Sequence, residues 1–178
     1  MGQRLRCWVT GISALVLATS AAAVSAGEWT VLVGGVKVQP LVIDAKLMAE
    51  LPRQAVDVSD HGKPAHFEGV WLRDVLLRAG APLGKALHGR DTALVVVLTA
   101  RDGYAASFSL ADFDASFRDR PILLADRRDG QPLLEATGPL QVVAADEKRA
   151  GRWIRQVANI EVVDPLASKV PPEEAAAR

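Results

Sequence analysis

Basic side chains gather in one segment near the end of the chain. Lys148, Arg152 and Arg155 lie in residues 146–157, directly after a run, residues 140–144, with the pattern of a buried strand. Arginine binds an anion through a planar fork of donors, whereas lysine acts as a point charge. These residue types predict a site for a phosphate or another small anion. Asp146 and Glu147 share the segment, so a solvated turn of mixed charge is the alternative.

The spacing of the two arginines restricts how they can act together. Residues 152 and 155 on one regular strand would face opposite ways, because side chains alternate along a strand. Both reach one site only if the chain between them turns or bulges. Arg152 follows Gly151, where the backbone bends most easily, and is therefore the stronger candidate.

A second group of polar side chains follows the most apolar run of the chain. Arg101, Asp102, Gly103 and Tyr104 come between residues 92–99 and residues 105–109. Glycine supplies the unusual backbone angle of a tight turn. Such a turn would set an arginine, a carboxylate and a phenol at one rim. A polar turn that only closes a hairpin is the alternative.

Other kinds of site find little support. The three histidines, His61, His66 and His88, lack metal-ligand spacing. The one cysteine, Cys7, precedes an apolar segment at residues 8–18 and falls in the expected leader, so we expect the mature chain to have no thiol. Without the leader arginines, the 21 basic residues become 19 against 21 acidic ones, a balance that gives no case for nucleic acid.

The two ends of the chain predict export and a single domain. Arg4 and Arg6 precede the apolar segment, and small residues at 24–26 suit a signal peptidase. We expect a signal peptide at 1–26, a domain at 27–164 and a disordered tail at 165–178. The apolar segment is too short for a stable membrane anchor, since a spanning helix needs about 20 residues. These features predict a periplasmic protein.

Strand patterns outnumber helix patterns, and the fold class we predict is α+β. Gly34 and Gly35 suit the turn of an opening hairpin between residues 29–33 and 36–43. Asp44 can cap a short helix through Leu51, and residues 71–80 have helical spacing with Gly80 as the cap. Residues 92–99 predict a strand covered on both faces. Further strands are expected at 54–58, 105–109, 122–125, 140–144 and 159–163.

Four motifs in order give the chain a family resemblance. FEGVWLRDVLLRAG, ARDGYAASFSLADF, PILLADRRDGQPL and ATGPLQVVAADEKRAGRWIRQVANIEVV occur in this sequence. Their order over residues 28–164 resembles the oxidoreductase molybdopterin-binding domain, the sulfite-oxidase-type fold, in a small stand-alone secreted form. The resemblance implies a mostly β mixed-sheet fold that holds molybdopterin. It also implies that Arg152 and Arg155 contact the phosphate or the pterin, and that Arg101 and Tyr104 lie at the pocket mouth.

The sequence departs from that family in three ways. Catalytically competent members bind molybdenum through a cysteine upstream of the segment that matches FEGVWL, and AVDVSDHGKPAH has none. Thr137-Gly138 stands where many members have His-Gly. The leader reads Arg4-Leu5-Arg6 instead of a twin arginine, which indicates export of an unfolded chain. We therefore expect no stoichiometric molybdenum.

Three hypotheses follow from the resemblance and the departures. The first is a secreted module that binds a pterin, a small anion or a periplasmic partner protein. The second is a molybdenum-pterin oxidoreductase of sulfite-oxidase type whose metal takes no thiolate from this chain. The third is a structural domain whose pocket has closed. Measurement of metal and pterin in the native protein separates the first two.

Overall fold

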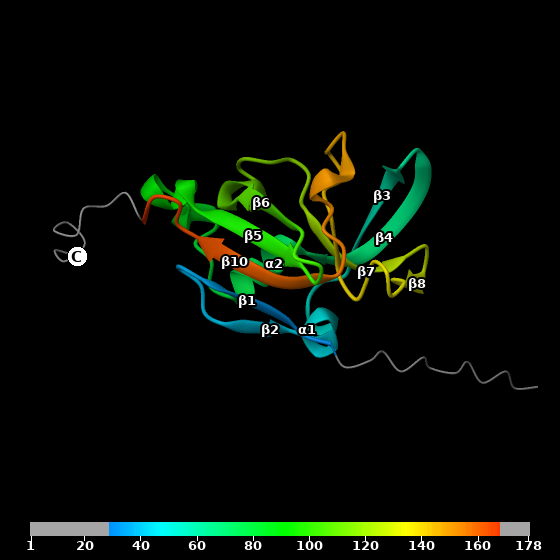
Figure 1. The fold of residues 1–178 in the computed structure, drawn as a ribbon. Helices are drawn as coiled ribbons and strands as arrows, with labels where there is room; N and C mark the ends of the chain where they lie inside the picture. The colour runs from blue at the N-terminus through cyan, green and yellow to red at the C-terminus, as the bar shows by residue number, and fades with distance from the viewer. Residues whose placement is uncertain (1–28, 168–178) are drawn as a thin grey trace, which may run out of the picture.

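Two five-stranded β-sheets form the framework of the protein (Figure 1). A computed structural model describes residues 29–167; the expected leader and all but the first residues of the expected tail lie outside this range. The first sheet has the order β2-β1-β10-β5-β6, and the second has the order β3-β4-β7-β8 with β9 beside β7. The first sheet consists of β1 (Val31–Gly35), β2 (Leu41–Ile43), β5 (Val95–Ala100), β6 (Ala105–Ser109) and β10 (Val157–Val163). The second consists of β3 (Gln54–Asp60), β4 (Lys63–Trp71), β7 (Leu123–Arg128), β8 (Gln131–Pro132) and β9 (Gln141–Val143).

The opening hairpin is confirmed, but its turn lies further along the chain than predicted. β1 pairs with β2 antiparallel and with β10 parallel. Gly34 and Gly35 belong to β1, and Lys37 in the following turn takes the left-handed conformation with φ 61°. Gly35 is required for another reason: a Cβ there would lie 2.0 Å from the carbonyl oxygen of Val162 in β10. Gly35 therefore permits close strand packing, and neither glycine forms the turn.

Both predicted helices are present. α1 (Ala45–Glu50) begins after Asp44, whose Oδ1 accepts a hydrogen bond of 2.8 Å from the amide of Leu47. This contact satisfies one of the free amides at the helix start. α2 (Leu72–Arg78) buries one apolar face and is followed by Gly80 with φ 86°. The spacing of apolar residues was sufficient to predict α2 because a single stripe of its side chains faces the core.

The strand predicted to be covered on both faces is covered fully on only one. β5 begins at Val95, since residues 89–93 form a 3-10 helix, η2 (Gly89–Ala93). Val96, Leu98 and Ala100 are buried, whereas the alternate side chains remain half-buried. The prediction of cover on both faces was wrong because a run of valines has no polar positions to mark the outer face.

The longest strand was not predicted from the sequence. β4 has nine residues and pairs with β3 on one side and β7 on the other. Its charged side chains hide the alternation of a strand, and Gly69 interrupts it at a register shift. A Cβ on Gly69 would lie 2.0 Å from the carbonyl oxygen of Leu124. The glycine allows β7 to approach closely at this irregularity.

The apolar core joins both sheets and α2 into one cluster. Phe67 of β4, Leu98 of β5 and Leu124 of β7 are fully buried in it. Trp153 packs edge-on against Phe67, with ring centroids 6.2 Å apart. This continuous core confirms the mostly β, α+β fold with few short helices. Within residues 29–167, no helix has both the length and the apolar character needed to cross a membrane.

Candidate functional site

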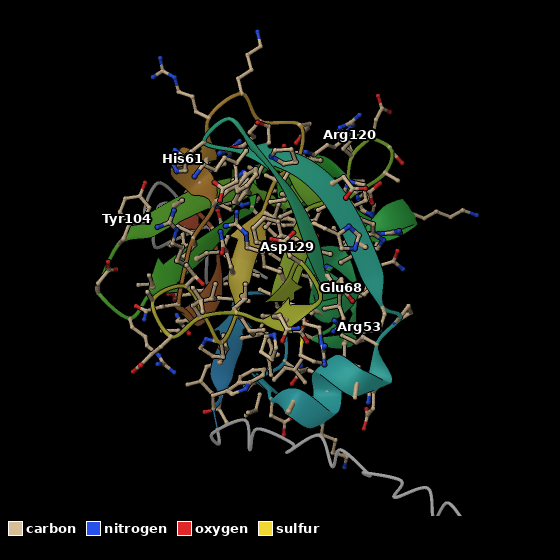
Figure 2. All side chains as sticks on the ribbon, turned by 90° about the vertical axis from the view of Figure 1, so that its right-hand side faces the viewer. Arg53, His61, Glu68, Tyr104, Arg120 and Asp129 are labelled. Atoms are coloured by element: carbon tan, nitrogen blue, oxygen red, sulfur yellow. The ribbon has the colours of Figure 1, made fainter. Side chains whose placement is uncertain are left out.

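A cleft of about 490 Å³ opens where turns from the two sheets meet. The second sheet contributes Asp60 and His61 from the β3–β4 hairpin and Gln141 from β9. The first sheet contributes Tyr104 from the turn between β5 and β6. Figure 2 shows His61 and Tyr104 on the same side of the molecule. The remaining wall includes Arg155, which follows the 3-10 helix η4 (Ala150–Arg152).

Gln141 provides a buried amide at the base of this cleft. The residue is only 3% exposed. Its side chain makes no hydrogen bond to another described residue, yet its polar atoms are not sealed away from the surface. A buried amide without a partner is costly unless a ligand or water pairs with it. Gln141 is therefore available to bind a polar group in the cleft.

Arg155 supplies the positive charge of the cleft. Its side chain is exposed and forms no ion pair within residues 29–167. The next residue, Gln156, holds the backbone in place: its amide donates to Thr137 and its carbonyl accepts from the amide of Arg101. Because these two hydrogen bonds fix the backbone next to Arg155, its side chain extends into the cleft from a defined position.

Tyr104 is placed by the turn that the sequence predicted. Gly103 has φ 85°, and the amide of Tyr104 donates to Oδ1 of Asp102 over 2.9 Å. The phenol hydroxyl donates to the carbonyl oxygen of Gly151 over 2.7 Å. This bond ties the β5–β6 turn to η4. Tyr104 therefore closes one side of the cleft.

The negative charge of Asp60 is largely compensated. Nη1 of Arg128 lies 2.7 Å from its Oδ2, and Nε2 of His61 lies 3.7 Å from its Oδ1. The guanidinium of Arg128 also lies 5.2 Å from the ring centroid of Phe67. Asp60 is 9% exposed, so this pairing offsets the cost of burying a carboxylate. Asp60 therefore does little to repel an anion bound at Arg155.

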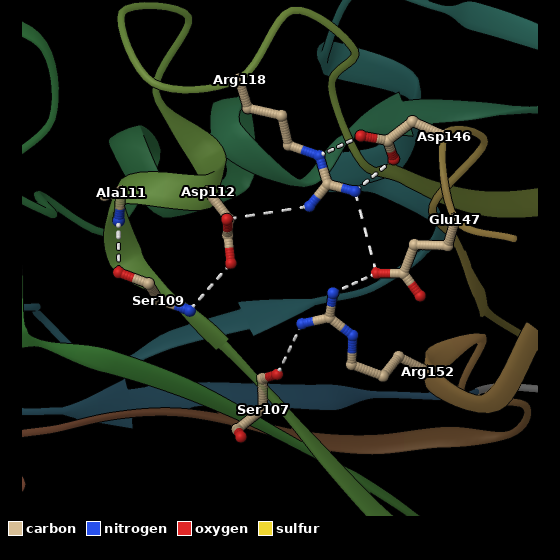
Figure 3. Close-up of polar contacts among 8 residues, drawn as sticks. All are labelled: Ser107, Ser109, Ala111, Asp112, Arg118, Asp146, Glu147 and Arg152. Atoms are coloured by element: carbon tan, nitrogen blue, oxygen red, sulfur yellow. Dashed lines mark hydrogen bonds and ion pairs between the residues drawn. The ribbon is translucent and has the colours of Figure 1, made fainter. Parts of the chain in front are cut away.

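Arg152 is engaged elsewhere (Figure 3). Its Nη1 donates to the carbonyl oxygen of Ser107 over 3.1 Å, and its Nη2 pairs with the carboxylate of Glu147. The guanidinium also stacks 4.1 Å from the ring centroid of Phe108. The contacts with Ser107 and Phe108 connect η4 to β6, and the contact with Glu147 ties η4 to the segment that precedes it. Arg152 does not line the cleft.

Arg118 is the centre of the ion network that contains Arg152. Figure 3 shows its guanidinium directed at Asp146, with Asp112 and Glu147 on either side. Burial would raise the pKa of Asp146, but the hydrogen bond and charge of Arg118 outweigh it and hold that pKa below its usual value. The pKa of Arg118 is raised despite its burial, because the three carboxylates stabilise the charged form. The network fixes the segment that carries η4.

Asp112 also takes part in the N-terminal cap of a short helix. It lies in the 3-10 helix η3 (Leu110–Phe113), where its Oδ2 accepts from the amide of Ser109 over 3.0 Å. The Ser109 hydroxyl in turn accepts from the amide of Ala111. This reciprocal cap presents the other carboxylate oxygen of Asp112 to Arg118.

The structure therefore separates the five predicted site residues. Tyr104 and Arg155 line one cleft, whereas Arg152 is bound in the ion network. Arg101 and Lys148 are exposed and do not line the cleft, although Arg101 adjoins lining residues on both sides. The backbone does turn at Gly151, in η4, and the two arginines that follow reach different places.

Sequence reasoning did not place Gln141, Asp60 or His61 in a site, and it considered His61 only as a metal ligand. Gln141 was read only as part of a buried strand; a polar residue in such a strand is the signal that could have singled it out. Asp60 and His61 lie in the segment AVDVSDHGKPAH, to which the resemblance assigns the missing cysteine. Nothing in their spacing placed them beside a cleft.

The cleft suits the organic part of a molybdopterin better than the metal. Gln141 offers an amide to a ring edge, and Arg155 offers a guanidinium to an acidic group. In contrast, residues 29–167 contain no cysteine and no group of three histidine, aspartate, glutamate or cysteine side chains arranged to hold a metal ion. The donor set does not include the soft thiolate that the resemblance assigns to molybdenum. The residues present thus fit a pterin and do not fit the protein ligand of the metal.

Comparison with known proteins agrees with this architecture. No curated protein matches the sequence. Among solved structures, the sulfane dehydrogenase SoxCD from Paracoccus pantotrophus superposes with a TM-score of 0.57 at 16% identity. The match covers 76% of this chain and 38% of that one. At this identity the likeness shows the fold alone, and this chain spans well under half of the other.

A family assignment comes from the sequence itself. The family model described as the oxidoreductase molybdopterin binding domain matches residues 58–169. This range includes β4, the β5–β6 turn, β9 and η4, and so all the lining residues of the cleft. The chain belongs to the oxidoreductase molybdopterin-binding domain family, and its fold is of the sulfite-oxidase type.

Proposed function

We propose that the cleft binds a planar heterocycle of pterin type that carries one acidic group, and that the chain is a binding module without a metal-ligating cysteine. One observation carries this proposal. Gln141 and Arg155 line the same cleft, and neither side chain has a partner among residues 29–167. A cleft of about 490 Å³ falls in the usual range for small-molecule sites, which is roughly 300–1,000 Å³.

Gln141 and Arg155 recognise different parts of the ligand. The Gln141 amide has a donor and an acceptor, which match the neighbouring acceptor and donor of a ring amide edge. Arg155 pairs with a carboxylate or phosphate through its planar fork. Arg128 already compensates Asp60, so Arg155 is left to pair with the ligand, although Asp102 also lines the cleft as a second carboxylate. A single free guanidinium favours one acidic group over a diphosphate.

The proposed setting is the periplasm. The charged start, apolar centre and small residues of the first 26 positions support removal of a leader and export. In that compartment the module would bind a free pterin or small anion, or present it to a periplasmic partner protein. N-terminal sequencing of the exported protein, with an expected start near Gly27, tests this setting. Recovery of the intact leader in washed membranes would contradict it.

The alternative function is a molybdenum-pterin oxidoreductase of sulfite-oxidase type. The family match and the likeness to a sulfane dehydrogenase favour it. Elemental analysis of protein purified from its native compartment separates the two functions. We expect far less than one molybdenum per chain; about one per chain would replace the binding module with the enzyme.

The binding proposal is tested with two fluorescent probes, pterin and 6-carboxypterin. Both have the ring amide edge, but only 6-carboxypterin has an acidic group. We expect wild type to prefer 6-carboxypterin by about tenfold or more, the range of a charge-assisted hydrogen bond. Arg155→Ala should abolish this preference, and Gln141→Leu should weaken binding of both probes.

Arg152→Ala is the matched control, because Arg152 is a nearby arginine that does not line the cleft. It should leave the preference for 6-carboxypterin unchanged. Thermal unfolding of each variant shows whether the fold is kept. Equal affinities of wild type and Arg155→Ala for 6-carboxypterin, or no binding of either probe by wild type, would contradict the proposal.

A further inference from the structure

The outer strands of the two sheets differ in how far they expose their backbone. β2 has three residues, β6 has five, and β8 has two and contains Pro132. β3 is the longest outer strand, with seven residues. It contains no proline or lysine, and its register with β4 is regular from Gln54 to Asp60. Proline, lysine and bulges are the usual means by which an edge strand avoids pairing with another chain.

One side of the β3 backbone is without a partner in the described part of the chain. β3 pairs only with β4, and no other backbone hydrogen bond within residues 29–167 involves it. Figure 1 shows the β3–β4 hairpin projecting at one end of the molecule, with β3 beside β4. A free edge of this length can take an additional strand, whose main chain supplies the hydrogen bonds.

The side chains of β3 specify what such a strand would contain. Val56 and Val58 are half-buried on the core side, whereas Ala55, Asp57 and Ser59 are exposed on the other side. The side chain of Asp57 is 87% exposed. It is the only charged side chain between positions 54 and 59. A complementary strand therefore has apolar residues opposite the valines and a basic residue opposite Asp57.

The neighbouring strand places charges of both signs beside Asp57, whose Oδ1 is paired with His66 and whose Oδ2 has no partner among residues 29–167. Glu68 of β4 lies opposite Ala55, on the exposed face with Asp57. His66 lies opposite Asp57, with 2.7 Å between its Nδ1 and Oδ1 of Asp57. In Figure 2 Glu68 and Asp129 lie on the side of the molecule that this hairpin presents. Lys63 is at the far end, opposite Asp60.

A second copy of this chain fits the edge poorly. Residue 57 is the centre of β3, so two antiparallel copies in full register would place Asp57 against Asp57. Like charges directly opposite each other destabilise a strand pair. The charge pattern thus favours a different protein over self-pairing.

We propose that the free edge of β3 binds an extended segment of a partner protein in which apolar residues flank a lysine or arginine. The segment adds a strand to the second sheet and pairs its basic residue with Asp57. β3 ends at Asp60, which lines the cleft with His61. The bound segment therefore runs toward the cleft mouth. The proposal does not depend on which ligand the cleft takes.

The test uses the peptide Ser-Thr-Val-Lys-Val-Thr-Ser, blocked at both ends, and a matched peptide with Glu in place of Lys. Amide hydrogen exchange of the full chain shows where each peptide protects the backbone. We expect the Lys peptide to protect β3, and Asp57→Lys to reverse the preference between the peptides by about fivefold, the size of a cross-strand charge pair. Of two Lys peptides, one N-methylated at both valines and one N-methylated at the lysine and both threonines, the one that loses the amides facing β3 should not bind.

Three results would overturn the proposal. They are no protection of β3 by the Lys peptide, protection confined to another surface, and equal peptide preference in wild type and Asp57→Lys. Sedimentation of the protein alone tests for self-pairing. If the protein forms a dimer and hydrogen exchange shows β3 protected in it, the edge binds a second copy of this chain instead. Asp57 is highly exposed, so Asp57→Lys should keep the fold, which thermal unfolding verifies.

Discussion

Arg152 and Arg155 lie three residues apart, yet they belong to different regions of the molecule. Arg152 stacks on Phe108 and pairs with Glu147, inside an ion network centred on Arg118. Arg155 lines the cleft and forms no ion pair within residues 29–167. An arginine held by several partners contributes to stability, whereas an arginine without partners can give its donors to a ligand. The difference shows that partners, and not residue type, separate structural from binding arginines.

Removal of the Arg118 side chain, the centre of the ion network, should have the largest effect on the free energy of unfolding. The side chain of Arg118 is 11% exposed and is surrounded by three carboxylates. Arg118→Ala removes the cation that pairs with Asp112 and Asp146 and leaves Glu147 with Arg152 alone, so we expect a loss of about 2–3 kcal/mol in the free energy of unfolding. Urea denaturation measures it. Arg120→Ala, an exposed arginine of the same loop, is the control and should change stability by less than about 0.5 kcal/mol. Equal losses of unfolding free energy in Arg118→Ala and Arg120→Ala would show that the ion network does not set Arg118 apart from an exposed arginine.

Arg152→Ala should have a smaller effect on stability. The variant loses the stack on Phe108 and the pair with Glu147, but the Arg152 side chain is 41% exposed, so solvent weakens these contacts. We expect a loss of about 1 kcal/mol in the same urea experiment. Arg152→Lys should recover only part of it, because lysine lacks the planar fork. A variant as stable as wild type would show that η4 is held by other contacts.

Acid should weaken the network through Asp146. Its folded-state pKa is lowered by Arg118, so the unfolded chain binds a proton more readily than the folded one. The resulting stability is fully present above the unfolded value of about 4 and is lost as pH falls through the lower folded value. We expect Asp146→Asn to reduce the decline in unfolding free energy between pH 5 and pH 3, measured relative to wild type. If the unfolding free energies of wild type and Asp146→Asn fell equally between pH 5 and pH 3, Asp146 would not be the group that weakens the network in acid.

Arg155→Ala should change stability least. The side chain is exposed and unpaired among described residues, so we expect a change within about 0.5 kcal/mol. Thermal unfolding without ligand measures it. A loss as large as that of Arg152→Ala would mean that Arg155 is also a structural residue, and the contrast between the two arginines would fail.

Local patterns predicted local structure well. Asp44 as a helix cap, the helical stripe from Leu72 to Leu76, and Gly103 in a turn were all confirmed. Each depends on neighbours within a few residues. β4 was missed and the glycine pair in β1 misread, because Gly69 and Gly35 respond to the backbones of β7 and β10, which are distant in the sequence. A glycine that permits close approach looks the same in sequence as one that forms a turn.

The sequence by itself determined the α+β class, most of the elements, and the family through the order of its motifs. It also placed basic residues in the segment around Gly151. Only the tertiary structure decided that Glu147 and Phe108 take Arg152, that Arg155 is left for the cleft, and that Gln141 joins it there. The physical reason is that the partners of a charged side chain come from strands and loops that meet only after folding.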